Sequence, residues 1–235
     1  MLFLKFIPGP IRSYFLKFAG ILSIPGVKHT SEFYYWHTQL SRDGGTFRNK
    51  WYRGLMLHIA GEKEQDFVTD KVIADFGCGP RGSLCWAENA KERIGIDVLT
   101  DKYRLLGIDS QNMRYVPSSE TSIPLPSNSI DTLFTINAMD HVDNFEAMCR
   151  EIVRILKPGG ELIGSFNLDE KPSLNEPQTL TEEMLKLSLL HNFDILTYRM
   201  AKHGPKGHSY KHFADGSEPP TTGPRRLWLR ARIKG

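Results

Sequence analysis

The segment Lys71–Gly82 reads Lys-Val-Ile-Ala-Asp-Phe-Gly-Cys-Gly-Pro-Arg-Gly and decides the fold of this chain. Its apolar run, Val72–Ala74, is typical of a strand buried on both faces. Asp75 follows that run, and residues 83–89 further on read as a helix with Ser83 as its N-cap. Between them lie three glycines, Gly77, Gly79 and Gly82. Glycine lets the backbone turn tightly against a ligand, and the N–H groups of a helix start point toward it, so the segment predicts a nucleotide pocket.

Strands and helices alternate on the carboxyl side of this segment. A helix is expected over 144–156, ended by Pro158-Gly159-Gly160, and a second helix is expected from Thr181 to His191. The further strands are expected at 93–97, 113–116, 130–136, 161–166, 193–200 and 226–233. Because the last two strands follow one another without an intervening helix, the pattern predicts an α/β fold. Its seven-stranded, mostly parallel sheet would end in a C-terminal antiparallel hairpin.

The first part of the chain predicts an N-terminal helical cap over residues 1–66, followed by a ligand-binding domain over 67–235. Residues 31–60 are rich in aromatic side chains and contain two expected helices separated by Gly44-Gly45. These aromatics would attach the cap to the sheet, or they would form a lid over a flat or apolar substrate. Residues 11–23 fit a helix with one apolar face, which would pack on the domain. The alternative is peripheral membrane contact through residues 1–24.

Charge, cysteine content and hydropathy limit the classes of protein to which the chain can belong. The formal net charge of the 235-residue chain is only +3, although both ends are basic, so the charge alone does not indicate a nucleic-acid partner. The three cysteines, Cys78, Cys85 and Cys149, form no Cys-x-x-Cys pair and read as reduced thiols of a cytoplasmic protein. No run of eighteen apolar residues and no convincing signal peptide is present. Nothing in the sequence indicates an oligomeric state.

Asp97 and His141 are two further candidate site residues. Asp97 ends the second expected strand about twenty residues after the glycines, where a carboxylate can accept both ribose hydroxyls of a nucleoside. The alternative is that Asp97 only begins the next turn. His141 lies with Asn137 just after the fourth strand, at the edge where ligands bind. The histidines of the late loop are not expected to bind a metal, because no cysteine lies near them: His203, His208 and His212.

With these motifs in place, the chain resembles the class I S-adenosylmethionine-dependent methyltransferases, which have a Rossmann-like fold. Within them it is similar to the type 11 group, which includes the ubiquinone and menaquinone biosynthesis methyltransferases. Asp75–Gly82 resembles the cofactor loop Asp-x-Gly-x-Gly-x-x-Gly, and Asp97 ends the second strand. Ile123–Asp131 resembles Leu-Pro-Phe-Pro-Asp-x-Ser-Phe-Asp, and Leu156–Gly160 matches Leu-Lys-Pro-Gly-Gly. The resemblance covers residues 71–166.

The resemblance implies roles by position. Asp75 and the turn Gly77–Gly79, Cys78 included, would hold the methionine end of S-adenosylmethionine. Asp97 would bind the ribose and Val98 would pack on the adenine. An acid that bonds the adenine amino group aligns with Ser119, with Glu120 one residue later. Asn137 and His141 would lie where the acceptor meets the sulfonium, and His141 would be either a general base or a residue that closes the pocket.

The sequence therefore predicts a methyltransferase acting on a small-molecule acceptor. The basic ends suggest an acidic acceptor, such as a sugar phosphate, a nucleotide sugar or a lipid-linked compound. Two alternatives stay open. The same glycines and Asp97 would suit an NAD-dependent oxidoreductase, although no hydride-transfer site is evident. A methyltransferase-fold protein that binds a partner without turnover is the other alternative.

Overall fold

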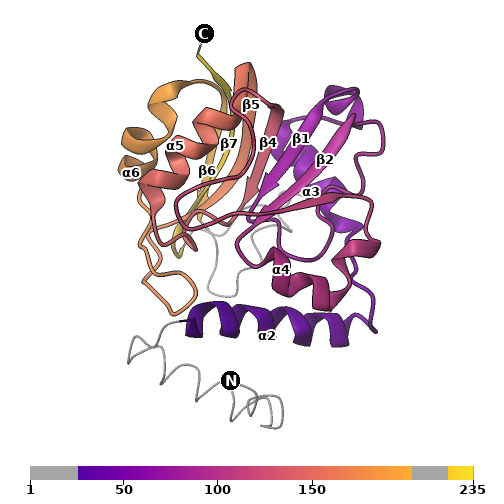
Figure 1. Ribbon diagram of the computed structural model, residues 1–235. Helices are drawn as coiled ribbons and strands as arrows, with labels where there is room; N and C mark the ends of the chain where they lie inside the picture. The colour runs from indigo at the N-terminus through magenta and orange to yellow at the C-terminus, as the bar shows by residue number, and fades with distance from the viewer. Residues whose placement is uncertain (1–25, 203–221, 235) are drawn as a thin grey trace.

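A computed structural model of the chain describes residues 26–202 and 222–234 (Figure 1). The helix expected at 11–23, the membrane contact expected through residues 1–24 and the three late histidines lie outside these ranges. Within them, no helix is both long and apolar enough to cross a lipid bilayer.

The described chain builds one seven-stranded sheet in the order β3-β2-β1-β4-β5-β7-β6. Its first five strands are parallel, and β7 runs antiparallel to both β5 and β6. The strands are β1 Val72–Phe76, β2 Glu92–Asp97, β3 Arg114–Pro117, β4 Ile130–Ile136, β5 Leu156–Leu168, β6 Phe193–Lys202 and β7 Arg225–Ile233. This confirms the predicted parallel sheet with its antiparallel hairpin. Strand order reverses direction between β1 and β4, and such switch points form the ligand crevice of open α/β sheets.

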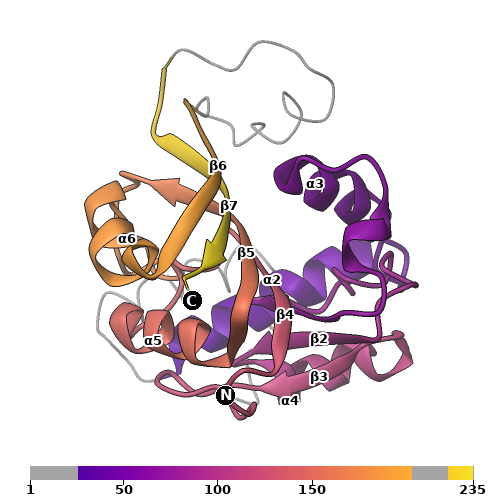
Figure 2. The ribbon, with the colours of Figure 1, turned by 90° about the horizontal axis from the view of Figure 1, so that it is seen from above.

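Helices cover both faces of the sheet. α5 (Phe145–Ile155) packs with α6 (Glu182–Ser188) on one face, and α3 (Trp51–Ala60) packs on the other (Figure 2). The remaining helices are α2 Val27–Arg42, α4 Thr100–Tyr103, η2 Gln65–Val68, η3 Arg104–Leu106, η4 Ile108–Ser110 and η5 Leu190–Asn192. Residues of one strand alternate between the faces, since Ile73 packs in the α3 cluster and Ala74 in the α5 cluster.

Capping residues explain where two of these helices begin. The Asn144 side chain accepts a hydrogen bond from the Ala147 N–H at 3.1 Å, and Thr181 accepts one from Met184 N–H at 3.1 Å. Both starts agree with the prediction, although α6 ends at Ser188 rather than His191.

Two local predictions were wrong. Residues 83–89 form turns rather than a helix, with i to i−3 bonds such as Ala87 N–H to Leu84 C=O at 3.0 Å. The Ser83 hydroxyl donates to Asp75 and so does not cap a helix. Helix α5 ends at Ile155, before Pro158-Gly159-Gly160, because Leu156 already pairs with Ile130 as part of β5. The Pro-Gly-Gly triplet lies at the register shift between β4 and β5 instead.

Candidate functional site

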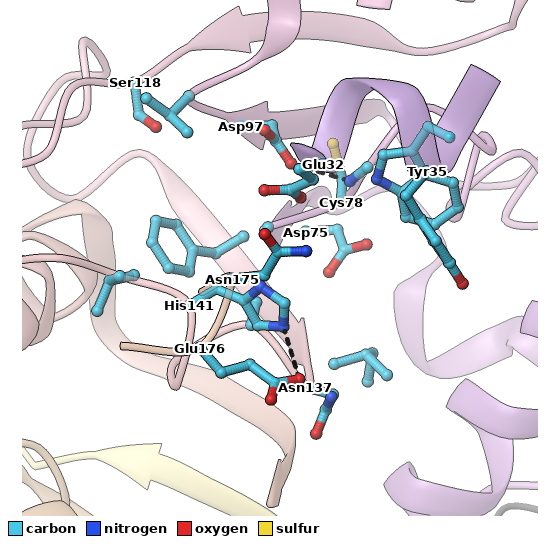
Figure 3. Close-up of a pocket in the computed structure, with 18 of the residues that line it drawn as sticks. Glu32, Tyr35, Asp75, Cys78, Asp97, Ser118, Asn137, His141, Asn175 and Glu176 are labelled. Carbon is cyan, nitrogen blue, oxygen red and sulfur yellow. Dashed lines mark hydrogen bonds and ion pairs between the residues drawn. The ribbon is translucent and has the colours of Figure 1, made fainter. Parts of the chain in front are cut away.

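A cavity of about 650 Å³ opens at the carboxyl ends of the parallel strands (Figure 3). Its volume is typical of a small-molecule site. The ends of β1, β2 and β4 form its floor, and α2 lies across these strand ends (Figure 1). All ten site residues named from the sequence line it: Asp75, Gly77, Cys78, Gly79, Asp97, Val98, Ser119, Glu120, Asn137 and His141. Their roles in binding stay a prediction.

The glycine turn is fixed by close contacts on two sides. Gly77 and Gly79 have left-handed backbone φ values of 70° and 55°. A Cβ added to Gly77 would lie 2.2 Å from the Ala138 Cβ, and one added to Gly79 would lie 2.9 Å from the Trp36 ring. The Gly77 N–H also donates to the Ile96 C=O at 2.8 Å, so the turn is tied to β2. Only glycine satisfies both the backbone angle and the packing at these two positions.

Asp75, in β1, brings a buried carboxylate to the cavity. The residue is 2% exposed, and its Oδ2 accepts the Ser83 hydroxyl. Its Oδ1 has no hydrogen-bond partner within the described part of the chain. Burial raises the pKa of this carboxyl to about 7, the Ser83 hydrogen bond opposes the rise, and the charge of Asp97 adds to it. Asp75 therefore favours a ligand that brings a donor and positive charge.

Asp97 ends β2 on the other side of the turn. Its Oδ2 accepts the Gly79 N–H at 3.0 Å and its Oδ1 accepts the Leu99 N–H at 2.9 Å. Burial, followed by the charge of Glu32, raises the pKa of Asp97 to about 7. The hydrogen bond from Gly79 holds the Asp97 carboxylate against the backbone of the glycine turn.

The family resemblance predicts that Val98, Ser119 and Glu120 lie near the adenine, and all three line the cavity. The Glu120 Oε1 lies 3.1 Å from the His29 Nε2 of α2, and this hydrogen bond lowers the pKa of Glu120. Ser119 Oγ accepts the Ser122 N–H at 2.9 Å and so shapes the loop itself. Glu120 therefore has a protein partner across the cavity mouth.

The opposite end of the cavity holds Asn137 and His141. Asn137 has a φ of 53°, its N–H donates to the Ser165 C=O at 2.8 Å, and its buried Oδ1 has no partner among the described residues. The His141 Nε2 lies 3.7 Å from Glu176 Oε1 (Figure 3). It also lies 3.9 Å from Asp140 Oδ1. Asp140 is 4% exposed, and burial raises its pKa to about 6. At the end where an acceptor is expected, the His141 imidazole thus lies between the Glu176 carboxylate, which lines the cavity, and the buried Asp140 carboxylate, which does not.

Sequence reasoning missed several residues that line the cavity. Lys28, Glu32, Tyr35 and Trp36 come from α2, and Glu176 comes from the loop between β5 and α6. The Tyr103 hydroxyl donates to Glu32 at 3.2 Å, which holds the Glu32 side chain beside Asp97. The many aromatic side chains of residues 31–60 were a signal that this segment reaches the cavity, because a lid over the substrate is one of their two predicted roles. No sequence motif indicated that Glu32 or Glu176 lines the cavity.

Comparison with known proteins finds methyltransferases. The family model described as a methyltransferase domain matches residues 74–164. The ubiquinone/menaquinone biosynthesis C-methyltransferase of Pasteurella multocida is 30% identical over 120 residues, which cover 50% of this chain and 40% of that protein. The malonyl-[acyl-carrier protein] O-methyltransferase of Enterobacter lignolyticus is 27% identical over 113 residues, which cover 47% of this chain and 45% of that protein. The chain therefore spans less than half the length of these two relatives.

Among solved structures, the S-adenosylmethionine-dependent methyltransferase of Mesorhizobium loti has the same fold. Its TM-score is 0.56 at 16% sequence identity, and the match covers 76% of this chain and 97% of that one. This match covers a larger part of the chain than the methyltransferase-domain match at 74–164.

Proposed function

We propose that this chain is an S-adenosylmethionine-dependent methyltransferase that transfers a methyl group to a small-molecule acceptor. The match of residues 74–164 to a methyltransferase domain and the shared fold support this proposal. The observation that carries the proposal is the placement of two buried acids around one glycine turn. Asp75 and Asp97 reach the same cavity from adjacent strands, and Gly77 and Gly79 separate them. This arrangement offers carboxylates to a ligand that bears both positive charge and ribose hydroxyls.

The residues present fit S-adenosylmethionine on grounds of charge and shape. Asp75 Oδ1 has no described partner and would accept a hydrogen bond from the cofactor's ammonium group. Asp97 would accept the ribose hydroxyls, and Val98 would pack on the adenine. Burial is the main cause of the raised pKa of Asp75 and Asp97, and repulsion adds to it, from Asp97 on Asp75 and from Glu32 on Asp97. A cationic ligand would relieve this repulsion. A dinucleotide would instead bring two phosphates toward these carboxylates.

When bound, S-adenosylmethionine supplies a sulfonium methyl: the acceptor's lone pair forms the new bond to carbon, and sulfur keeps the electrons of the broken bond. The protein's part is to align the acceptor, and orientation of this kind provides up to roughly 7–11 kcal/mol of the barrier reduction. His141 lies beside that region and stays the predicted base for an acceptor that loses a proton. Asn137 and Asn175 add polar groups to the same wall.

The acceptor is proposed as a small molecule because the cavity is concave and of limited volume. The relatives' names describe methylation in quinone biosynthesis and of a malonyl-carrier conjugate. An acidic acceptor stays a prediction. Most of the basic residues after Ile195 lie within the described ranges, and three of them already pair with acids of the protein: Arg225 with Asp169, and Arg230 and Arg232 with Glu161.

Calorimetric titration of the full chain with S-adenosylhomocysteine, beside NAD, tests the cofactor assignment. We expect S-adenosylhomocysteine to bind with a micromolar dissociation constant and NAD to give no heat. The Asp97→Ala variant should lose at least tenfold in affinity because the ribose loses its acceptor. Asp101→Ala, which removes an exposed aspartate of α4, serves as the matched control. Binding of NAD alone would overturn the assignment, whereas binding without turnover of any acceptor would favour a non-catalytic role.

A further inference from the structure

His141 and Glu176 line the acceptor end of the cavity, and the buried Asp140 lies beside them. One ligand atom from each, a carboxylate oxygen or a ring nitrogen, lies within 4.8 Å of the other two. Asp140 and His141 follow β4, whereas Glu176 comes from the loop that precedes α6. Figure 3 shows the His141 and Glu176 side chains pointing toward one another. At 3.9 and 3.7 Å, His141 forms ion pairs with Asp140 and Glu176 that are too long to be hydrogen bonds.

Asp140 is the unusual member of this cluster. It is 96% buried, and neither of its carboxylate oxygens has a hydrogen-bond donor within the described ranges. A buried carboxylate is normally paired or hydrogen-bonded, because desolvation without compensation is costly. Within the described ranges, its Oδ1 forms an ion pair with His141, and His141 is shared with Glu176. The local charge balance therefore leaves an excess of anionic oxygen.

We propose that Asp140, His141 and Glu176 bind a divalent metal cation of the manganese or zinc class. Two carboxylates with one imidazole form a donor set that suits these cations better than calcium, which takes oxygen ligands. With metal–ligand bonds of about 2.0–2.2 Å, ligand atoms lie roughly 3.0–3.5 Å apart. The present separations of 3.7 and 3.9 Å need only small side-chain rotations to reach that spacing.

The surrounding contacts hold the ligands in place. The Ser173 hydroxyl lies 3.2 Å from Glu176 Oε2, which leaves Oε1 facing His141. The Gln178 side chain donates to the Val142 C=O at 2.8 Å and so ties this loop to the segment after β4. Three protein ligands leave further coordination positions directed at the cavity, as in catalytic metal sites.

The role of the cation rests on the proposed function, but its binding does not. In a methyltransferase, a cation at this end would bind a hydroxyl oxygen of the acceptor and lower its pKa, so that the hydroxyl proton passes to water. The oxygen would then form its bond to the methyl carbon. His141 would act as a ligand and not as a free base, which makes a hydroxylated acceptor the expected substrate class.

The test is a titration of the EDTA-treated full chain with Mn²⁺, followed by electron paramagnetic resonance, with Zn²⁺ as a competitor. We expect one Mn²⁺ per chain, displaced by one Zn²⁺. Asp140→Asn and Glu176→Gln should each weaken Mn²⁺ binding at least tenfold. Glu146→Gln, which alters an exposed acid in the first turn of α5, should bind as the parent does. Two ligand variants are used because a change at the buried Asp140 could prevent folding.

S-Adenosylhomocysteine titration of the same proteins separates the two proposals. Mn²⁺ binding without S-adenosylhomocysteine binding would support the metal site and count against the methyltransferase assignment. S-Adenosylhomocysteine binding with no Mn²⁺ or Zn²⁺ uptake would overturn the metal site and leave His141 as the predicted base. Equal, weak Mn²⁺ binding by the parent and all variants would also overturn it, since the cation would then bind elsewhere on the surface.

Discussion

At the scale of single residues, the cavity depends on positions where side-chain size and backbone angle are both restricted. Gly77 is the clearest case, with a φ of 70° and no room for a Cβ. Gly159 has nearly the same angle, 74°, but nothing lies within 4 Å of its virtual Cβ. Alanine substitutions at these two glycines therefore distinguish the free-energy cost of the backbone angle from that of the steric contact.

Gly77→Ala should lower the free energy of unfolding by more than ~2 kcal/mol, because strain and overpacking add. It should also abolish S-adenosylhomocysteine binding. Gly159→Ala should cost about 1 kcal/mol and leave binding unchanged. Denaturant unfolding and calorimetry on both variants measure this. Equal losses of stability would show that Ala138 moves aside easily.

At the scale of elements, α2 determines how enclosed the cofactor cavity is. Its residues contact the segments that follow three different strands. Glu32 accepts a hydrogen bond from the Tyr103 hydroxyl after β2, His29 bonds Glu120 after β3, and Lys28 donates to the His141 C=O after β4. Trp36 lies against Gly79, and the Arg81 guanidinium lies 5.7 Å from the centre of its ring. The helix is therefore expected to cover the cofactor.

Trp36→Ala should weaken S-adenosylhomocysteine binding about tenfold, roughly 1.4 kcal/mol, because the ligand loses apolar contact and stays more hydrated. Leu105→Ala, at a side chain that is 80% exposed, is the control for loss of an apolar group. Calorimetry provides the measurement. An unchanged affinity for the Trp36 variant would mean that the helix does not contact the cofactor.

At the scale of the whole molecule, an ion-pair network joins the end of α3 to β5 and to the last strand, β7. Glu161 of β5 is buried and binds Arg230 Nη2 at 2.9 Å and Arg232 Nη2 at 2.8 Å, both in β7. Arg230 also donates to the Ala60 C=O at 2.9 Å and to Glu62 at 2.7 Å, at the end of α3. The predicted boundary at residue 66 stays a prediction, while α3 packs directly on the sheet through Met56 and its neighbours.

Glu161→Gln should lower the free energy of unfolding by about 3 kcal/mol, because two arginines lose their shared acid while Arg230 stays mostly buried. Glu64→Gln breaks the exposed Arg53–Glu64 pair and should change stability by less than about 1 kcal/mol. Urea unfolding of both variants compares them. A small loss at Glu161 would indicate that water replaces the ion pair.

The sequence by itself determined the sheet, its antiparallel end and the residues on the cavity floor. These follow from local signals: short apolar runs, glycines and acids at strand ends each act within a few residues of one another. Only the tertiary structure decided that 83–89 form turns, because the Ser83 hydroxyl is drawn to Asp75. It alone brought α2 across the strand ends and Glu176 beside Asp140 and His141. Those contacts join segments more than thirty residues apart, and such pairings leave no periodic pattern in the sequence because folding of the intervening chain creates them.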